Sequence, residues 1–180
     1  IRTLEIRPGW DLQDNNILAC PRRHVDAVFD MLAAQPKPIR FSGGLEAARI
    51  TPDIAAAVAR LRIEILFTAF DRPDQNRAVE RAIKRLREAT GWTDGTTRHK
   101  IGCYCLVGFD GDTPPAAASR LDWIRALGAR PFPMFYLGPD AAQHHPPREW
   151  SAALRRYLRP SALYAKTKTP PHNLPLEAAR

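Results

Sequence analysis

Hydrophobic and polar positions along the chain repeat one pattern. A short apolar run rich in β-branched and aromatic residues is followed by a polar turn, and then by a segment with apolar residues at helical spacing. The runs predict strands at 15–20, 38–44, 63–71, 99–110 and 130–138, and residues 1–6 form either a further short strand or the tail of a missing element. Strand starts that recur roughly every 25 to 35 residues, each followed by a helix, predict a βαβ series with a parallel sheet.

The helices between these runs have recognisable ends. Thr51 and Thr113 are the expected N-caps of the second and fourth helices, and Pro52 stands at the first helical position of the second. Gly91 is the expected stop of the third helix. The predicted buried stripes are Val25, Val28, Phe29 and Leu32; Ile54, Val58 and Leu61; Val79, Ile83 and Leu86; and Leu121, Ile124 and Leu127.

The pattern changes near residue 139. The segment 139–147 reads as a loop, and "REWSAALRRYL" predicts a basic amphipathic helix with Trp150, Leu154 and Leu158 on one face. A proline-rich tail follows. We therefore divide the chain into a barrel-like part at 1–138 and a C-terminal part at 139–180. Proline at two positions in the run 130–138 predicts a strand at or near a sheet edge.

Composition narrows the class of protein. Hydrophobic residues make up 44% and charged residues 26% of the 180, which is typical of one globular domain. No apolar run approaches the roughly 20 residues of a membrane span, and no signal peptide is expected. Three cysteines, too few for a disulfide framework, favour the cytoplasm. The net charge of +8 suits a polyanion such as nucleic acid, or equally a solvated arginine-rich surface.

Candidate binding residues cluster where the predicted strands end. In both open and closed parallel α/β sheets, ligands bind at the carboxyl ends of the strands. We expect these ends to form one rim. The rim residues are Asp14, Asn15 and Asn16; Ser42, Gly43, Gly44 and Glu46; Phe70 and Asp71; Gly108, Phe109 and Asp110; and Tyr136 and Gly138.

The order of these segments resembles a known family. Successive segments read "DNNILAC", "IRFSGGLEAARITPDIAAAVARL", "ILFTAFDRPDQNRAVERAIKRLREATG" and "HKIGCYCLVGFDGDTPPAAASRLDWIRALGARPFPMFYLG". Together they resemble the middle and C-terminal part of a radical S-adenosylmethionine (radical SAM) domain, over residues 1 to about 138. The resemblance implies an α/β fold, a partial (β/α)6 TIM-type barrel with parallel strands whose first βα unit is missing here.

The resemblance also implies cofactors. Such a domain holds a [4Fe-4S] cluster on a CxxxCxxC loop after its first strand, and the cluster reduces S-adenosylmethionine to a 5′-deoxyadenosyl radical. This chain contains no CxxxCxxC. Cys103 and Cys105 are two apart on a strand and are expected in the core. We expect no metal site in this chain. The resemblance implies that the cluster loop would precede Ile1, so either the chain is a fragment of a longer protein or the loop has been lost. As it stands, the chain is expected not to generate a radical.

Each candidate residue has a functional and a structural interpretation. Gly43 and Gly44, after Ser42, form either a tight turn or a surface for the methionine end of the cofactor. Glu46 and Arg49 bind its amino and carboxylate groups or form a surface ion pair.

The other candidates leave the same choice open. The resemblance places Asn15 and Asn16 near the cofactor's amino group, although Asp14–Asn16 is also a common turn composition. It places Phe70 and Asp71 near the ribose, where Asp71 would otherwise cap a helix. Gly108, Phe109 and Asp110 lie where adenine would pack, or form a plain βα turn.

Two functions from different classes follow. The first is the cofactor-binding body of a radical SAM enzyme, with the substrate unknown. The alternative is a cluster-less, non-enzymatic α/β module that binds nucleic acid or a protein partner through its basic surface. The arginines expected on that surface are Arg81, Arg85, Arg87, Arg155 and Arg156.

Overall fold

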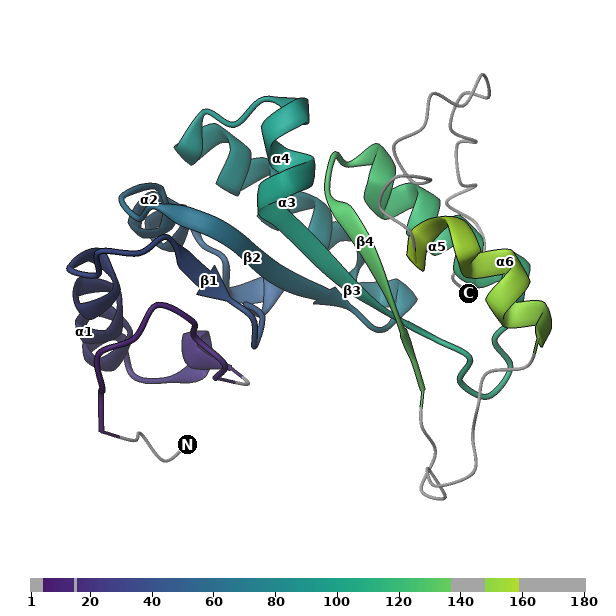
Figure 1. The fold of residues 1–180 in the computed structure, drawn as a ribbon, viewed down its shortest axis with the longest axis horizontal. Coiled ribbons are helices and arrows are strands. Elements are labelled where there is room, and N and C mark those ends of the chain that lie inside the picture. Colours follow the sequence, from purple (N-terminus) through teal and green to yellow (C-terminus); the bar gives the residue numbers. More distant parts are fainter. Residues whose placement is uncertain (1–4, 15, 137–147, 159–180) are drawn as a thin grey trace.

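A computed structural model describes residues 5–14, 16–136 and 148–158. The fold is α/β, and its four strands form one parallel sheet in the order β1-β2-β3-β4 (Figure 1). The strands are β1 (Ile39–Phe41), β2 (Ile63–Phe70), β3 (Ile101–Val107) and β4 (Arg130–Phe135). The helices are α1 (Arg22–Ala33), α2 (Pro52–Ala59), α3 (Asn76–Thr90), α4 (Asp94–Lys100), α5 (Pro114–Ala126) and α6 (Arg148–Leu158).

The strand order of the described sheet follows the order of the strands along the chain. Each strand pairs with the next one in sequence, and the order does not reverse as it does in a doubly wound sheet. With right-handed crossovers, this order places the connecting helices on the same face of the sheet. Such a sheet is consistent with part of an α/β barrel.

The predicted first strand at 15–20 is wrong. Residues Ile17–Ala19 form a 3₁₀ helix, because the Asp14 carboxylate accepts the Asn16 N–H at 2.8 Å and turns the chain. The pairing occurs earlier, at Asp11, which forms an isolated parallel bridge with Arg40 of β1. Of the other expected strand at 1–6, residues 5 and 6 are not in a strand and the rest lies outside the described residues.

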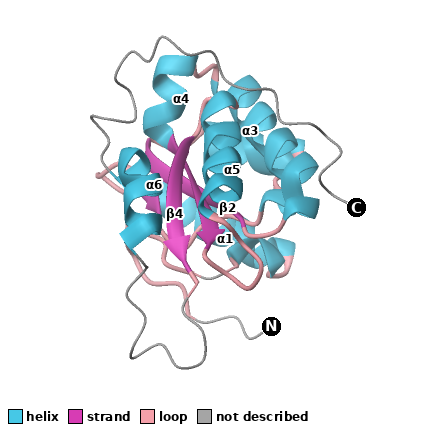
Figure 2. Cartoon of the chain, turned by 90° about the vertical axis from the view of Figure 1, so that its right-hand side faces the viewer, coloured by secondary structure: helices cyan, strands magenta, loops and turns pink. Residues whose placement is uncertain are grey.

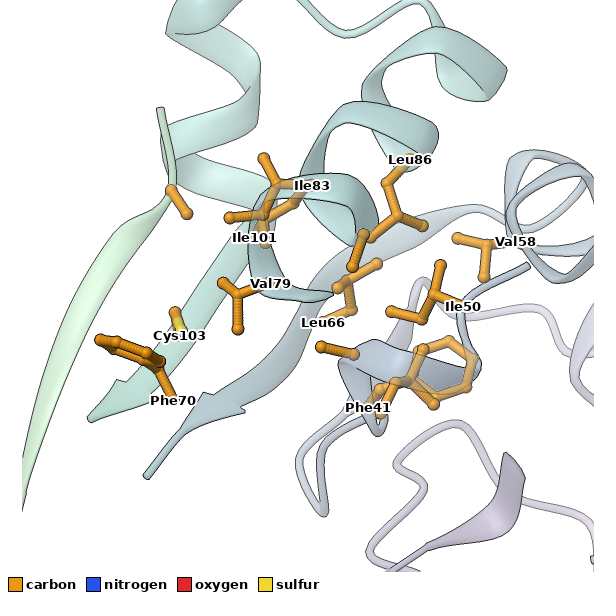
Figure 3. Close-up of a cluster of buried hydrophobic side chains, with 14 of the residues drawn as sticks. Phe41, Ile50, Val58, Leu66, Phe70, Val79, Ile83, Leu86, Ile101 and Cys103 are labelled. Atoms are coloured by element: carbon orange, nitrogen blue, oxygen red, sulfur yellow. The ribbon is translucent and has the colours of Figure 1, made fainter. Parts of the chain in front are cut away.

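The main core lies between the sheet and its helices. Ile101, Cys103, Cys105 and Val107 alternate along β3 and are fully buried. Figure 3 shows Cys103 close to Phe70 of β2 and Val79 of α3, in a cluster that also contains Leu66, Ile83 and Leu86. The predicted helix stripes are confirmed as buried with one exception: Leu127 is half-buried.

The opposite face of the sheet carries an aromatic group of its own. Phe67 stacks on Tyr104 with ring centroids 4.4 Å apart, and Phe67 and Phe132 form a T-shaped pair with ring centroids 5.0 Å apart. The Phe67 ring lies over Gly102, where a Cβ would come within 2.4 Å of it. Phe67 is buried without belonging to the main core.

The expected edge strand is confirmed at β4. Tyr136 N–H donates to the Val107 carbonyl, so the backbone N and carbonyl groups of the odd-numbered residues Pro131 and Pro133 point away from β3, toward the open edge of the sheet. Helix α6 packs against both α5 and β4 (Figure 2), where Trp150 meets Phe135 at 6.2 Å.

The buried face of α6 differs from the prediction. Trp150 and Leu154 are buried as expected, but Leu158 is exposed and Tyr157 is buried instead. The face continues three residues after Leu154 rather than four, and the Tyr157 hydroxyl donates to the Ala118 carbonyl at 3.1 Å. The predicted loop at 139–147 and the tail from 159 lie outside the described residues.

The helix boundaries agree with the capping signals. Thr51 and Thr113 accept N–H groups of the first turns of α2 and α5, and Gly91 ends α3 in the left-handed conformation. The sequence pattern does not predict helix α4, whose N-cap is Thr93. Residues 99 and 100, expected in the fourth strand, belong to this helix, and the strand begins at Ile101. No helix in the described ranges is long and apolar enough to span a membrane.

Candidate functional site

The candidate residues follow the ends of adjacent strands. Ser42 follows β1, Asp71 follows β2, Gly108 follows β3 and Tyr136 follows β4. Because the strands are parallel, these positions lie along one edge of the sheet. Asn15 and Gly138 lie outside the described residues.

Hydrogen bonds bring three of the candidates together. The Asn16 Nδ2 donates to Glu46 Oε2 at 2.8 Å, and the Arg49 Nε donates to the same oxygen at 2.6 Å. The hydrogen bond from Asn16, with a smaller contribution from Arg49, lowers the pKa of the Glu46 carboxyl below its ordinary value. Glu46 is therefore a carboxylate at neutral pH with two donors fixed on one of its oxygens.

The other end of the Asn16 amide is unsatisfied. Its Oδ1 is buried and accepts no hydrogen bond from any described residue. The orientation of the amide is fixed, because the carboxylate of Glu46 can only accept. A buried acceptor beside a carboxylate suits a donor from a ligand, since an unpaired buried polar atom costs about 1–3 kcal/mol.

The Gly43–Gly44 pair has a structural role. A Cβ on Gly43 would lie 2.2 Å from the Asp14 carbonyl oxygen, so only glycine lets the two chain segments approach this closely. Gly44 has φ +85° and Leu45 N–H then donates to the Phe67 carbonyl at 2.7 Å. The turn thus holds residues 12–14 against the end of β1, close to where Asn16 contacts Glu46.

Phe70 and Asp71 end β2 differently from one another. The Phe70 ring is 4% exposed and packs 5.0 Å from Trp123, so its side chain belongs to the core. Asp71 does not cap α3; instead the Gln75 side chain accepts the Asp71 N–H at 2.9 Å. Partial desolvation raises the pKa of the Asp71 carboxyl.

The loop after β3 contains an ion pair that the sequence did not predict. Asp112 and Arg120 form a bidentate pair at 2.9 and 2.7 Å, with side chains 1% and 14% exposed. Gly108 N–H donates to Asp112 at 2.9 Å, and the Arg120 guanidinium lies 5.2 Å from the Phe109 ring. In the sequence, the trace of this ion pair is Asp112 directly before the N-cap Thr113 and Arg120 two helical turns later.

These groups remain separate within the described residues. No hydrogen bond or ion pair there joins Asp71 or the loop 108–112 to the Asn16–Glu46–Arg49 cluster. One link crosses the sheet: the Tyr104 hydroxyl of β3 donates to the Ser42 carbonyl at 3.2 Å. The cluster and the loop therefore form two halves of the edge.

The cysteines do not fit an iron–sulfur cluster. Cluster iron is held by deprotonated thiolates of several cysteines that lie close together. Cys103 and Cys105 are fully buried behind the helices, and burial raises the pKa of the Cys103 thiol strongly and that of Cys105 to about 11. Over the described ranges, no three Cys, His, Asp or Glu side chains gather as a metal site would require.

A surface hollow of about 660 Å³ lies away from this edge. It is formed by the end of α3, the start of α4 and the end of α5, with Lys84, Glu88 and Trp92 among its residues. Helix α3 runs back from the carboxyl end of β2, so its C-terminal end lies toward the amino ends of the strands. The hollow therefore contributes nothing to the candidate site.

Most of the arginines proposed for a basic surface have partners in the chain. Arg85 donates to the Ile50 carbonyl at 2.8 Å, Arg87 pairs with Asp94, and Arg156 pairs with Asp122. Such neutralised or carbonyl-bound guanidinium groups offer less to a polyanion than unpaired ones do.

The chain was compared with protein-family models, curated proteins and solved structures. No family, no curated protein and no solved structure matches this chain.

Proposed function

We propose that this chain is the S-adenosylmethionine-binding body of a radical SAM enzyme. The observation that carries the proposal is the buried, unsatisfied Asn16 Oδ1 next to the Glu46 carboxylate at the carboxyl end of β1. The methionine end of the cofactor has an ammonium group that can donate to both acceptors. When bound, this cofactor supplies the adenosyl group for radical chemistry in such enzymes.

Different residues of the chain would bind different parts of the cofactor. Glu46 and Asn16 would accept from the ammonium group, and the remaining N–H groups of Arg49 would donate to the cofactor's carboxylate. The loop 108–110 would receive the adenine. Asp71, half-way between them along the edge, would accept from a ribose hydroxyl; its carboxyl accepts no hydrogen bond from another described residue.

The cluster is not part of what this chain supplies. The cysteines of this chain do not fit a [4Fe-4S] cluster, so the ligands of the cluster would come from residues outside this sequence. We place the missing first βα unit of a (β/α)6 barrel beside residues 10–12, which pair with β1. Pro131 and Pro133 support β4 as the last strand, since their outward positions lack N–H donors.

Calorimetric titration with S-adenosylmethionine tests the proposal. Glu46→Gln should weaken binding at least tenfold, because it removes the charge that faces the ammonium group. Glu64→Gln is the matched control: Glu64 also pairs with an arginine at 2.6 Å, namely Arg40, but lies at the other end of β2. Binding that is absent in the wild-type chain, or weakened equally by both variants, would contradict the proposal.

The basic-surface alternative makes a different prediction. Nucleic acid held by arginine–phosphate contacts should dissociate as salt is added, because binding releases counterions. Binding to a single-stranded RNA that persists unchanged between 50 and about 200 mM salt would exclude that mode.

A further inference from the structure

The Asp112–Arg120 pair connects both ends of the loop that follows β3. Asp112 accepts the N–H of Gly108, at the end of the strand, and the N–H of Thr113, at the start of α5. Arg120 donates to the Leu106 carbonyl at 3.1 Å in addition to Asp112. The shape of the loop is therefore fixed by side chains that lie beneath it.

Among the ion pairs of the described residues, this one is the most deeply buried. Arg156–Asp122 and Arg49–Glu46, for comparison, have side chains between 37% and 51% exposed. A buried ion pair is weak grounds for stability, because desolvation offsets most of its attraction. Stability alone therefore does not account for a buried pair at this strand end, whereas holding a binding loop in one conformation does.

The loop presents an aromatic side chain at the edge. Phe109 is half-buried, and the guanidinium of Arg120 lies 5.2 Å from its ring centroid. The same guanidinium is held by Asp112 and by the Leu106 carbonyl, so Phe109 packs on a fixed group. A purine base is a flat ligand that gains from such a fixed ring and from ordered backbone groups beside it.

We propose that Asp112 and Arg120 are positioning residues for the adenosine end of the ligand. This inference rests on the proposed function and deepens it: recognition of the adenosine end depends on this pair, whereas recognition of the amino-acid end depends on Glu46. Asp112 and Arg120 act through the loop 108–111 and do not contact the ligand themselves.

Two ligands distinguish recognition of the adenosine end from recognition of the amino-acid end. S-adenosylmethionine carries both ends, whereas 5′-methylthioadenosine carries the adenosine end without the ammonium and carboxylate groups. Asp112→Asn should weaken binding of both ligands by the same factor, at least tenfold. Glu46→Gln should weaken S-adenosylmethionine and leave 5′-methylthioadenosine within twofold of wild type. Asp122→Asn, which breaks the Arg156 ion pair on α5, is the control and should leave both affinities unchanged.

A purely structural role would give a different result. The free energy of unfolding of each variant is measured in urea, and affinities are compared where each variant is fully folded. If Asp112→Asn does not fold, Arg120→Lys keeps the charge, loses the bidentate geometry and serves as the second variant. Full affinity for 5′-methylthioadenosine in the folded variant overturns the inference alone. Failure of the wild-type chain to bind either ligand overturns the proposed function with it.

Discussion

Gly43 offers the sharpest test of how the site is assembled. In Gly43→Ala the new Cβ would stand 2.2 Å from the Asp14 carbonyl oxygen and 2.7 Å from the Gln13 carbonyl carbon. Both neighbours are backbone atoms, so neither can rotate away. An ordinary contact requires the segment 13–14 to move by about 1 Å, which would stretch the hydrogen bond from Gly43 N–H to the Leu12 carbonyl.

The expected loss of stability follows from these contacts. Overpacking costs about 1–3 kcal/mol, and a weakened backbone hydrogen bond adds about 0.5–1.5 kcal/mol. We therefore expect the free energy of unfolding to fall by about 2–4 kcal/mol. Gly44→Ala should cost only about 1–2 kcal/mol, because its φ of +85° is strained for alanine while the nearest atom lies at 3.7 Å.

Urea unfolding, followed by far-ultraviolet circular dichroism and tryptophan fluorescence, measures these changes. Gly9→Ala is the control, because nothing lies within 4 Å of its Cβ, and it should remain within about 0.5 kcal/mol of wild type. A Gly43→Ala variant that is less destabilised than Gly44→Ala, or as stable as the control, would refute overpacking at Gly43.

Three further predictions concern other parts of the chain. Gly102→Ala should lower the free energy of unfolding by about 1–3 kcal/mol in urea, because its Cβ would overlap the stacked Phe67 ring; a change below 0.5 kcal/mol would contradict this. Iodoacetamide at pH 8 should alkylate Cys20 in the native protein and the two buried cysteines of β3 only after unfolding, as mass spectrometry can show; native labelling of all three would refute the burial. The hydrogen bond from Asn16 lowers the pKa of Glu46, so the ionised carboxylate should make the wild-type chain more stable than Glu46→Gln. This difference in the free energy of unfolding should be complete above the ordinary pKa of a glutamate and should vanish as the pH falls through the lowered pKa of Glu46. A difference that does not depend on pH between about 2 and 7 would contradict this prediction.

Local signals in the sequence predicted most of the fold. Thr51 with Pro52, Thr113 and Gly91 each act within one helical turn, and their predicted roles are confirmed. The stripe of α3 was readable because three buried residues repeat at helical spacing on an otherwise charged helix.

Pairing between distant segments was harder to predict. The isolated bridge at Asp11 pairs with Arg40, which is far along the chain. The residues around Asp11 do not alternate between apolar and polar, so the sequence there gives no strand signal. The apolar residues of 17–19 looked like a strand, yet the Asp14 side chain turns the backbone before one can form. A three-residue apolar run does not distinguish the two outcomes.

The candidate site was predicted only in part for the same reason. Glu46 and Arg49 are three residues apart, and their contact follows from a single turn. That Asn16 completes the cluster depends on where the chain returns after α1, and that Asp112 pairs with Arg120 depends on how α5 sits on β3. Neither has a local signature strong enough to identify it alone.

The two prolines of β4 have a consequence for how copies of this chain meet at high concentration. An exposed edge of a parallel sheet can recruit a strand from another molecule, which is a common start of aggregation. On the outer side of β4, Pro131 and Pro133 replace two successive N–H donors, and α6 packs alongside. A strand from another molecule could not form the hydrogen bonds that these two missing N–H groups would donate, so we expect this edge to resist pairing between molecules.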